Sequence, residues 1–309
     1  MNNTRRYLAL AWIFIIVAFT ATAASLPKNS PVPGGIAIIK LAKHNVEPPI
    51  VMYRGDRVTI VADKSGKFWQ AIVGIPLNAN PAKKQVLQVK TPNKKALVYF
   101  SLKPKTYPLR RITIKDKSKV TPSAEQAAVI REQSETIENI LDQWQDTTNI
   151  DANFILPVKG IFSSPFGQRR IFNNVRRARH TGLDIVAPLG TPIKAPADGT
   201  VLATGDFIIN GNTVFINHGQ GLISFYCHLE KIDVEPGEMV KQGEVIGFVG
   251  STGRSTGAHL HWGVSLNGVR VNPLLFVAKK SLAKTQKQNK AKKHQQGADK
   301  KRKFSTNQS

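Results

Sequence analysis

The sequence RHTGLD at residues 179–184 opens the stretch that organises this chain, and the stretch continues to residue 264. FYCHL follows at residues 225–229, and STGAHLHW at residues 255–262. Four of the seven histidines of the chain lie in these three segments, together with one aspartate. This clustering of imidazoles around a carboxylate indicates a metal site, with histidines left over for catalysis.

The spacing of these residues supports a common site. His259 and His261 are two residues apart in an expected strand, so both rings can lie on one face. Between His180 and Asp184, Gly182 permits a sharp turn before an apolar strand begins, so both side chains can reach one ion. Two histidines and one carboxylate leave an open zinc position for water, as catalytic sites do. A closed structural site usually uses several cysteines, and this chain has one.

Strand alternation makes two further predictions. Tyr226 and His228 should share a face, so that Tyr226 points into the site and can assist there. Cys227 should point away from His228 as a small buried residue, although a zinc thiolate is the alternative. No internal disulfide can form from a single cysteine. His218, at a strand-to-turn transition, should make a structural hydrogen bond rather than bind a metal.

The order of the motifs resembles the LytM/lysostaphin-type zinc metallopeptidases of family M23, which are cell-wall endopeptidases. The resemblance covers residues 163–276 and rests on several independent motifs. They include SPFGQRR at residues 164–170, APLGTPI at 187–193, APADG at 195–199, NHG at 217–219, YCHL at 226–229, GSTG at 250–253 and HLHW at 259–262.

The resemblance implies a complete site. His180, Asp184 and His261 would bind zinc, and His228 and His259 would be the catalytic histidines. The zinc would polarise the scissile carbonyl and lower the pKa of its water toward ~7, while the histidines orient the water, take its proton and stabilise the oxyanion. Either histidine can be the base. The implied substrate is the peptide crosslink of bacterial peptidoglycan.

Two other function classes compete with the enzyme. The family also contains regulators that have lost ligands and activate another wall hydrolase, but the intact residue set favours an enzyme. The expected fold is shared with lipoyl carriers and a phosphocarrier, so fold alone does not settle function. A signal segment and the His-x-x-x-Asp pair disfavour a carrier.

The expected fold class is mainly β, in several parts. Short β-branched and aromatic runs predict an N-terminal β-sandwich domain over residues 25–118, which resembles domains that position or cover the groove of such enzymes. A helical connector over residues 119–147 leads to an antiparallel barrel-sandwich hybrid domain over residues 148–276.

The connector helix has a clear beginning and an apolar stripe. Ser123 and Gln126 form a capping-box pattern. The helix should end at residues 146–149 and dock between the domains, with a partner-binding helix as the alternative. Its stripe at helical spacing comprises Ile130, Ile137, Leu141 and Trp144.

Residues 1–24 are typical of a secretory signal, with two arginines, a nearly continuous apolar run and an A-x-A pattern at residues 21–23. Because the apolar run is close to the lower length for spanning a bilayer, an uncleaved membrane anchor is the alternative. In either case the remaining chain is expected outside the cytoplasm, in the periplasm or cell envelope.

The charge of the chain is strongly positive, at +24, so an anionic partner is expected. Residues 277–309 form a basic tail expected to be disordered, with a net charge of +10 over residues 279–303. The tail is either a solubilising segment or a tether to an anionic envelope polymer or lipid. Nucleic acid is not expected, because the tail lacks interleaved aromatic residues apart from Phe304.

Overall fold

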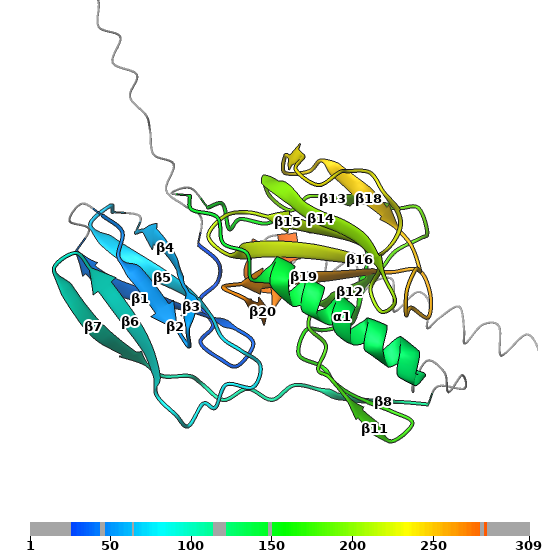
Figure 1. Ribbon diagram of the computed structural model, residues 1–309, viewed down its shortest axis with the longest axis horizontal. Coiled ribbons are helices and arrows are strands. Elements are labelled where there is room, and N and C mark those ends of the chain that lie inside the picture. The colour runs from blue at the N-terminus through cyan, green and yellow to red at the C-terminus, as the bar shows by residue number, and fades with distance from the viewer. Residues whose placement is uncertain are drawn as a thin grey trace, which may run out of the picture.

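The computed structural model describes residues 26–43, 47–63, 65–113, 122–147, 150–278 and 281–282. The expected signal or anchor at residues 1–24 and nearly all of the basic tail lie outside these residues. Within the described ranges, no helix combines the length and apolar character needed to cross a bilayer. The described chain is mainly β, with one long helix beside the larger of two β units (Figure 1).

The N-terminal unit is the expected sandwich of two antiparallel sheets. One sheet has the order β1-β5-β4 and the other β3-β2-β6-β7. Alternate residues of the two sheets meet in a core that includes Val51, Val73 and Leu87, all fully buried. Its strands are β1 (Ile36–Lys43), β2 (Ile50–Tyr53), β3 (Asp56–Arg57), β4 (Thr59–Ala62), β5 (Phe68–Gly74), β6 (Gln85–Thr91) and β7 (Lys94–Phe100).

A strap from the sandwich reaches the second unit. Strand β8 (Leu109–Ile112) pairs in parallel with β10 (Arg169–Phe172), which pairs with β11 (Val175–Arg177). Tyr107 anchors the strap, because its hydroxyl donates to the carbonyl of Pro33 at 2.7 Å and its ring packs edge-on against Phe166. Gly167 is required beneath that ring, since it has a φ of +80° and a Cβ there would lie 2.2 Å from Tyr107.

Helix α1 (Ala124–Leu141) begins with the predicted capping box between Ser123 and Gln126. The predicted end at residues 146–149 is wrong, because the helix ends at Leu141 with Asp142 as its cap. Trp144 lies beyond the helix, where its ring stacks under the Arg57 guanidinium at 4.6 Å. Gln145 is held by the second unit, since its carbonyl accepts from the backbone N–H of Gln220 at 2.9 Å. These tertiary contacts replace further helical turns.

The second unit is built on one open antiparallel sheet in the order β17-β14-β15-β16-β19-β12-β9, with β13, β18 and β20 as branches. Strand β16 pairs with β15, β18 and β19, and its residues from Leu222 to Leu229 are all buried. The elements are β9 (Ile161–Ser164), β12 (Leu183–Val186), β13 (Pro192–Lys194), β14 (Gly199–Phe207), β15 (Gly211–Asn217), β16 (Leu222–Ile232), β17 (Met239–Val240), β18 (Val245–Val249), β19 (Leu260–Leu266), β20 (Val269–Val271) and η2 (Pro273–Leu275).

Two buried amides join the units. The side chain of Gln220 accepts from the N–H of Ile60 at 2.7 Å and donates to the carbonyls of Ile60 and Thr147. Asn267 donates to the hydroxyl of Thr59 at 2.8 Å and accepts from the N–H of Gly74. The main hydrophobic core also includes residues of both units. The sandwich is therefore fixed against the second unit rather than loosely tethered.

Candidate metal centre

Strand register brings the first two candidate ligands together. Asp184 on β12 lies directly opposite His261 on β19, which lies opposite Cys227 on β16. His180 enters from the loop before β12, and its backbone N–H donates to the carbonyl of Gln168. Gly182 lets this loop pass closely, because a Cβ there would lie 2.6 Å from the His261 ring.

Three side-chain atoms converge at this point. Nε2 of His180 lies 2.8 Å from Oδ1 of Asp184, and Nδ1 of His261 lies 2.8 Å from the same oxygen. The two ring nitrogens are 3.0 Å apart. Two nitrogens and one carboxylate oxygen form a donor set suited to zinc, whose tetrahedral ligands at about 2.0–2.2 Å from the ion lie about 3.3 Å apart. A small outward movement of the three groups would therefore accommodate the ion.

The protonation state of His180 is also compatible with a bound cation. Nδ1 of His180 is 3.0 Å from the carbonyl of Pro165, which can only accept, so Nδ1 carries the proton and Nε2 presents a lone pair. Burial lowers the pKa of His180 to about 4, which keeps the ring neutral at pH 7. Nε2 thus faces the Asp184 carboxylate without a proton of its own. Lone pairs aimed at one point fit a bound cation, and the Pro165 carbonyl orients the ligand ring.

Asp184 has a second partner outside the donor set. Its Oδ2 lies 3.1 Å from Nη2 of Arg170 on β10, which leaves Oδ1 for the metal. Burial alone would raise the pKa of Asp184, but its close contacts with the His180 and His261 rings hold that pKa below its usual range. Arg170 belongs to the SPFGQRR motif, but sequence spacing gave no indication that it pairs with Asp184.

His228 and His259 lie beside these three residues. Their ring centroids are 4.8 Å apart, and Nε2 of His259 is 4.0 Å from Oδ1 of Asp184. Nδ1 of His228 donates to the carbonyl of Thr252 at 2.9 Å, and Nδ1 of His259 to that of Gly257 at 2.8 Å. Both Nε2 atoms are therefore acceptors. Burial lowers the pKa of His228 to about 4, so its ring is neutral at pH 7.

The predictions for Tyr226 and for the direction of Cys227 are wrong. Tyr226 pairs with Trp262 on the core face, where burial raises the pKa of its phenol and its hydroxyl is bonded to Ser224 at 2.7 Å. Cys227 shares the face of its strand partner His261. The cause is His228, whose φ of +66° interrupts the alternation of the strand and brings its ring to the His261 side.

Cys227 is buried, as expected. Burial raises the pKa of its thiol to about 12, so the free thiol is protonated at pH 7, and Cys227 is not among the three residues whose ligand atoms converge. His218 makes the predicted structural hydrogen bonds, donating from Nδ1 to the carbonyl of Asp198 at 2.7 Å and accepting from Ser224 at 2.8 Å. It lies outside the convergent group.

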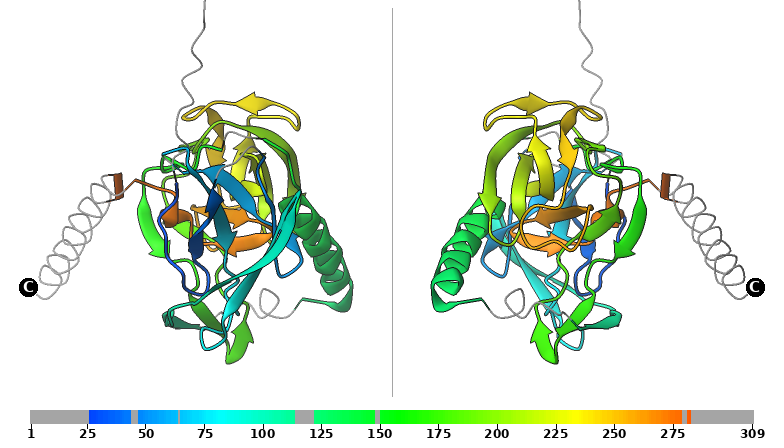
Figure 2. Two further views of the ribbon diagram at one scale, coloured as in Figure 1. Left: turned by 90° about the vertical axis from the view of Figure 1, so that its left-hand side faces the viewer. Right: turned by 90° about the vertical axis from the view of Figure 1, so that its right-hand side faces the viewer.

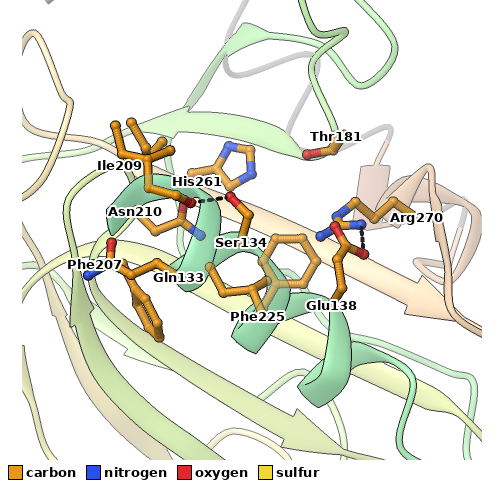
Figure 3. Close-up of a pocket in the computed structure, with 12 residues that line it drawn as sticks. Gln133, Ser134, Glu138, Thr181, Phe207, Ile209, Asn210, Phe225, His261 and Arg270 are labelled. Carbon is orange, nitrogen blue, oxygen red and sulfur yellow. Dashed lines mark hydrogen bonds and ion pairs between the residues drawn. The ribbon is translucent and has the colours of Figure 1, made fainter. Parts of the chain in front are cut away.

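Helix α1 borders a cavity of about 160 Å³ that reaches His261 (Figure 3). Glu138 of the helix pairs with Arg270 at 2.7 Å, and Gln133 accepts from the N–H of Ile208. The helix is anchored below by Leu141, which packs in a cluster with Phe215, Ile223, Phe225 and Cys227. The helix therefore forms one wall beside the candidate metal centre.

Two protein-family models match parts of this chain. Residues 178–273 match the model of peptidase family M23, and residues 29–105 that of the M23 N-terminal domain. A crystal structure from Pseudomonas aeruginosa, assigned to peptidase M23, is 39% identical with a TM-score of 0.68; the match covers 80% of this chain and 95% of that one.

Two curated relatives match over shorter regions. The DD-carboxypeptidase/endopeptidase Mpg of Neisseria meningitidis is 49% identical over 36% of this chain and 26% of its own length. The peptidoglycan DD-endopeptidase ShyC of Vibrio cholerae is 40% identical over 48% of this chain and 36% of its own. The chain thus matches about a third or less of these relatives' length.

Proposed function

This chain belongs to peptidase family M23, and on that basis we propose that it is a zinc-dependent endopeptidase that hydrolyses peptide crosslinks in bacterial peptidoglycan. The observation that carries the proposal is the convergence of His180, Asp184 and His261 on one point, with His228 and His259 beside it. The names of the relatives from Neisseria and Vibrio support the substrate.

The protonation of each residue at the site indicates the role that it would have. A zinc ion held by His180, Asp184 and His261 would supply a Lewis acid for the scissile carbonyl and acidify a water. One of His228 and His259 accepts the proton of the attacking water at Nε2, because its Nδ1 proton is held by a backbone carbonyl. The imidazolium so formed can donate to the developing oxyanion or to the leaving amine. Arg170 keeps the Asp184 carboxylate oriented.

The site of action that we propose is the periplasm or cell envelope. Support comes from the charged and apolar pattern of residues 1–24, whether that segment is cleaved or remains as an anchor. The basic tail would add attraction to an anionic envelope polymer or lipid.

The test is digestion of purified, crosslinked peptidoglycan, followed by chromatography of the muropeptides. We expect crosslinked dimers to fall, a chelator to prevent the loss and added zinc to restore it. Dimers that persist with zinc-loaded protein would overturn the proposal. If the same protein then accelerated a second wall hydrolase, the alternative function of a non-catalytic regulator would take its place.

A further inference from the structure

The three-stranded β8-β10-β11 sheet carries an unusual density of arginine. Two stretches of the chain form it, and neither residues 97–115 nor residues 152–183 contain an aspartate or glutamate. Figure 2 shows this sheet, teal to green, at the lower end of the molecule. We call the exposed arginines here the arginine sheet, which comprises Arg110, Arg111, Arg169, Arg176 and Arg179.

Strand register places these charges on neighbouring strands and, by alternation, on both faces of the sheet, with Arg110 on the face of Arg170 and both Arg111 and Arg176 on the other. Arg110 lies opposite Arg170, which also pairs with Arg177 in register, while Arg111 and Arg176 flank Ile171. Like charges on neighbouring strands destabilise a sheet. Among the described carboxylates, none forms an ion pair with a member of the arginine sheet. Within the described part of the chain, the fold therefore concentrates positive charge at this place without a carboxylate partner for these arginines.

The arginine sheet is continuous with the candidate metal centre. Arg170, the strand neighbour of Arg110, reaches Oδ2 of Asp184 at 3.1 Å. The N–H of Gly167 donates to the carbonyl of His180 at 2.7 Å, which ties the ligand loop to the start of β10. An anion bound on the face of the sheet that carries Arg110 would thus lie beside a substrate held at the site.

Guanidinium groups pair with carboxylates through parallel hydrogen bonds, and several together bind a polymer that carries many carboxylates. The stem peptides of peptidoglycan carry such free carboxylates. We propose that the arginine sheet is a second binding surface, which holds the carboxylates of stem peptides next to the crosslink being cut. This inference rests on the proposed function, because it takes the same polymer as the ligand.

The experiment measures binding without cutting. All proteins carry His228→Asn, and co-sedimentation with purified peptidoglycan sacculi gives their affinities. The test variant adds Arg110→Gln, Arg111→Gln and Arg176→Gln. The control variant adds Lys90→Gln, Lys94→Gln and Lys95→Gln, which remove the same charge from exposed positions of the sandwich.

We expect the arginine variant to bind about tenfold more weakly, since each lost charge pair contributes a few-fold, and the lysine variant to change less than about twofold. Amidation of the free carboxylates of the sacculi should weaken binding of the parent protein and remove the difference in affinity between the two variants. Thermal unfolding confirms that each variant is folded.

Equal affinities for the two variants would overturn the inference, as would binding that is insensitive to amidation. Vesicles containing phosphatidylglycerol test lipid phosphate as the ligand. If the arginine variant lost vesicle binding but kept sacculus binding, the surface would serve a membrane and the inference would fail. Because no hydrolysis is required here, failure of this inference is separate from failure of the muropeptide assay.

Discussion

At the scale of the residue, the conformation of His228 decides where this candidate catalytic ring lies. Asparagine tolerates its φ of +66° but lacks the imidazole, so His228→Asn should keep the three candidate ligands in place. We expect about one equivalent of zinc to remain and hydrolysis of crosslinked muropeptides to fall by about 10²–10⁴-fold. Metal analysis and chromatography measure the two quantities.

Tyr226→Phe is the matched control on the same strand. It removes only the hydroxyl bonded to Ser224, so it should lower the free energy of unfolding by about 1 kcal/mol and leave hydrolysis near the parent rate. Parent-like hydrolysis by His228→Asn, or a hydrolysis defect in Tyr226→Phe that matches it, would show that the two roles are wrongly assigned.

Arg170 is expected to act on the metal through Asp184. Removing the guanidinium in Arg170→Gln frees Oδ2 and lets the carboxylate rotate, so zinc affinity should fall about 10–100-fold. Competition with a chromophoric chelator measures this affinity. Arg176→Gln removes an exposed charge on the next strand and should leave the zinc affinity unchanged. An equal loss in both variants would mean that general charge, rather than the Asp184 contact, controls binding.

His218 makes stability depend on pH. Burial lowers its pKa to about 4, so the native ring stays neutral where the unfolded chain, with a pKa near ~6.5, takes up a proton. Its contribution is complete above pH ~6.5 and is lost as the pH falls toward about 4. Between pH 7 and pH 5 the parent should lose about 2 kcal/mol more unfolding free energy than His218→Gln in urea titrations. Parallel pH dependences would contradict this account.

At the scale of the element, helix α1 depends on its last apolar residue. Leu141 is buried against Phe215 and Phe225, so Leu141→Ala should reduce the free energy of unfolding by about 2–4 kcal/mol. Val129 on the same helix is exposed, and Val129→Ala should change the free energy of unfolding by about 0.5 kcal/mol or less. Urea denaturation measures both. Similar small changes would mean that the helix is not anchored at its end.

Local signals predict only part of these elements. The capping box of Ser123 and Gln126 marked the start of α1, because the signal is contained in four neighbouring residues. Trp144 continued the helical periodicity, but contacts of Gln145 with Asn217 and Gln220 hold that segment in another conformation. Strand alternation placed Tyr226 wrongly because it assumes an unbroken strand. The positive φ of His228, which breaks the alternation, could not be predicted from the sequence pattern.

At the scale of the whole molecule, the sequence predicts two β units but not how they join. Pairing of β8 with β10 connects residues about sixty positions apart, and the two buried amides that join the units, Gln220 and Asn267, are single polar residues in turns. Such contacts leave no periodic pattern. The way the units join affects the candidate metal centre, because β8 completes the sheet that presents Arg170 to Asp184. The N-terminal unit therefore helps to build the site.

This arrangement predicts that the two units unfold together. Glycine accommodates the φ of +44° at residue 220, so Gln220→Gly removes the bridging side chain without strain. It leaves the N–H of Ile60 and the carbonyl of Thr147 without that partner, which should lower the free energy of unfolding by about 2–3 kcal/mol. Calorimetry should give one transition for the parent and a lower or split transition for the variant. Asn174→Gly, at an exposed turn with a φ of +64°, is the control and should unfold like the parent. Two separate transitions in the parent would show that the hydrogen bonds of Gln220 and Asn267 do not couple the unfolding of the two units. The pairing of β8 with β10 would then be the contact that holds β10 in place.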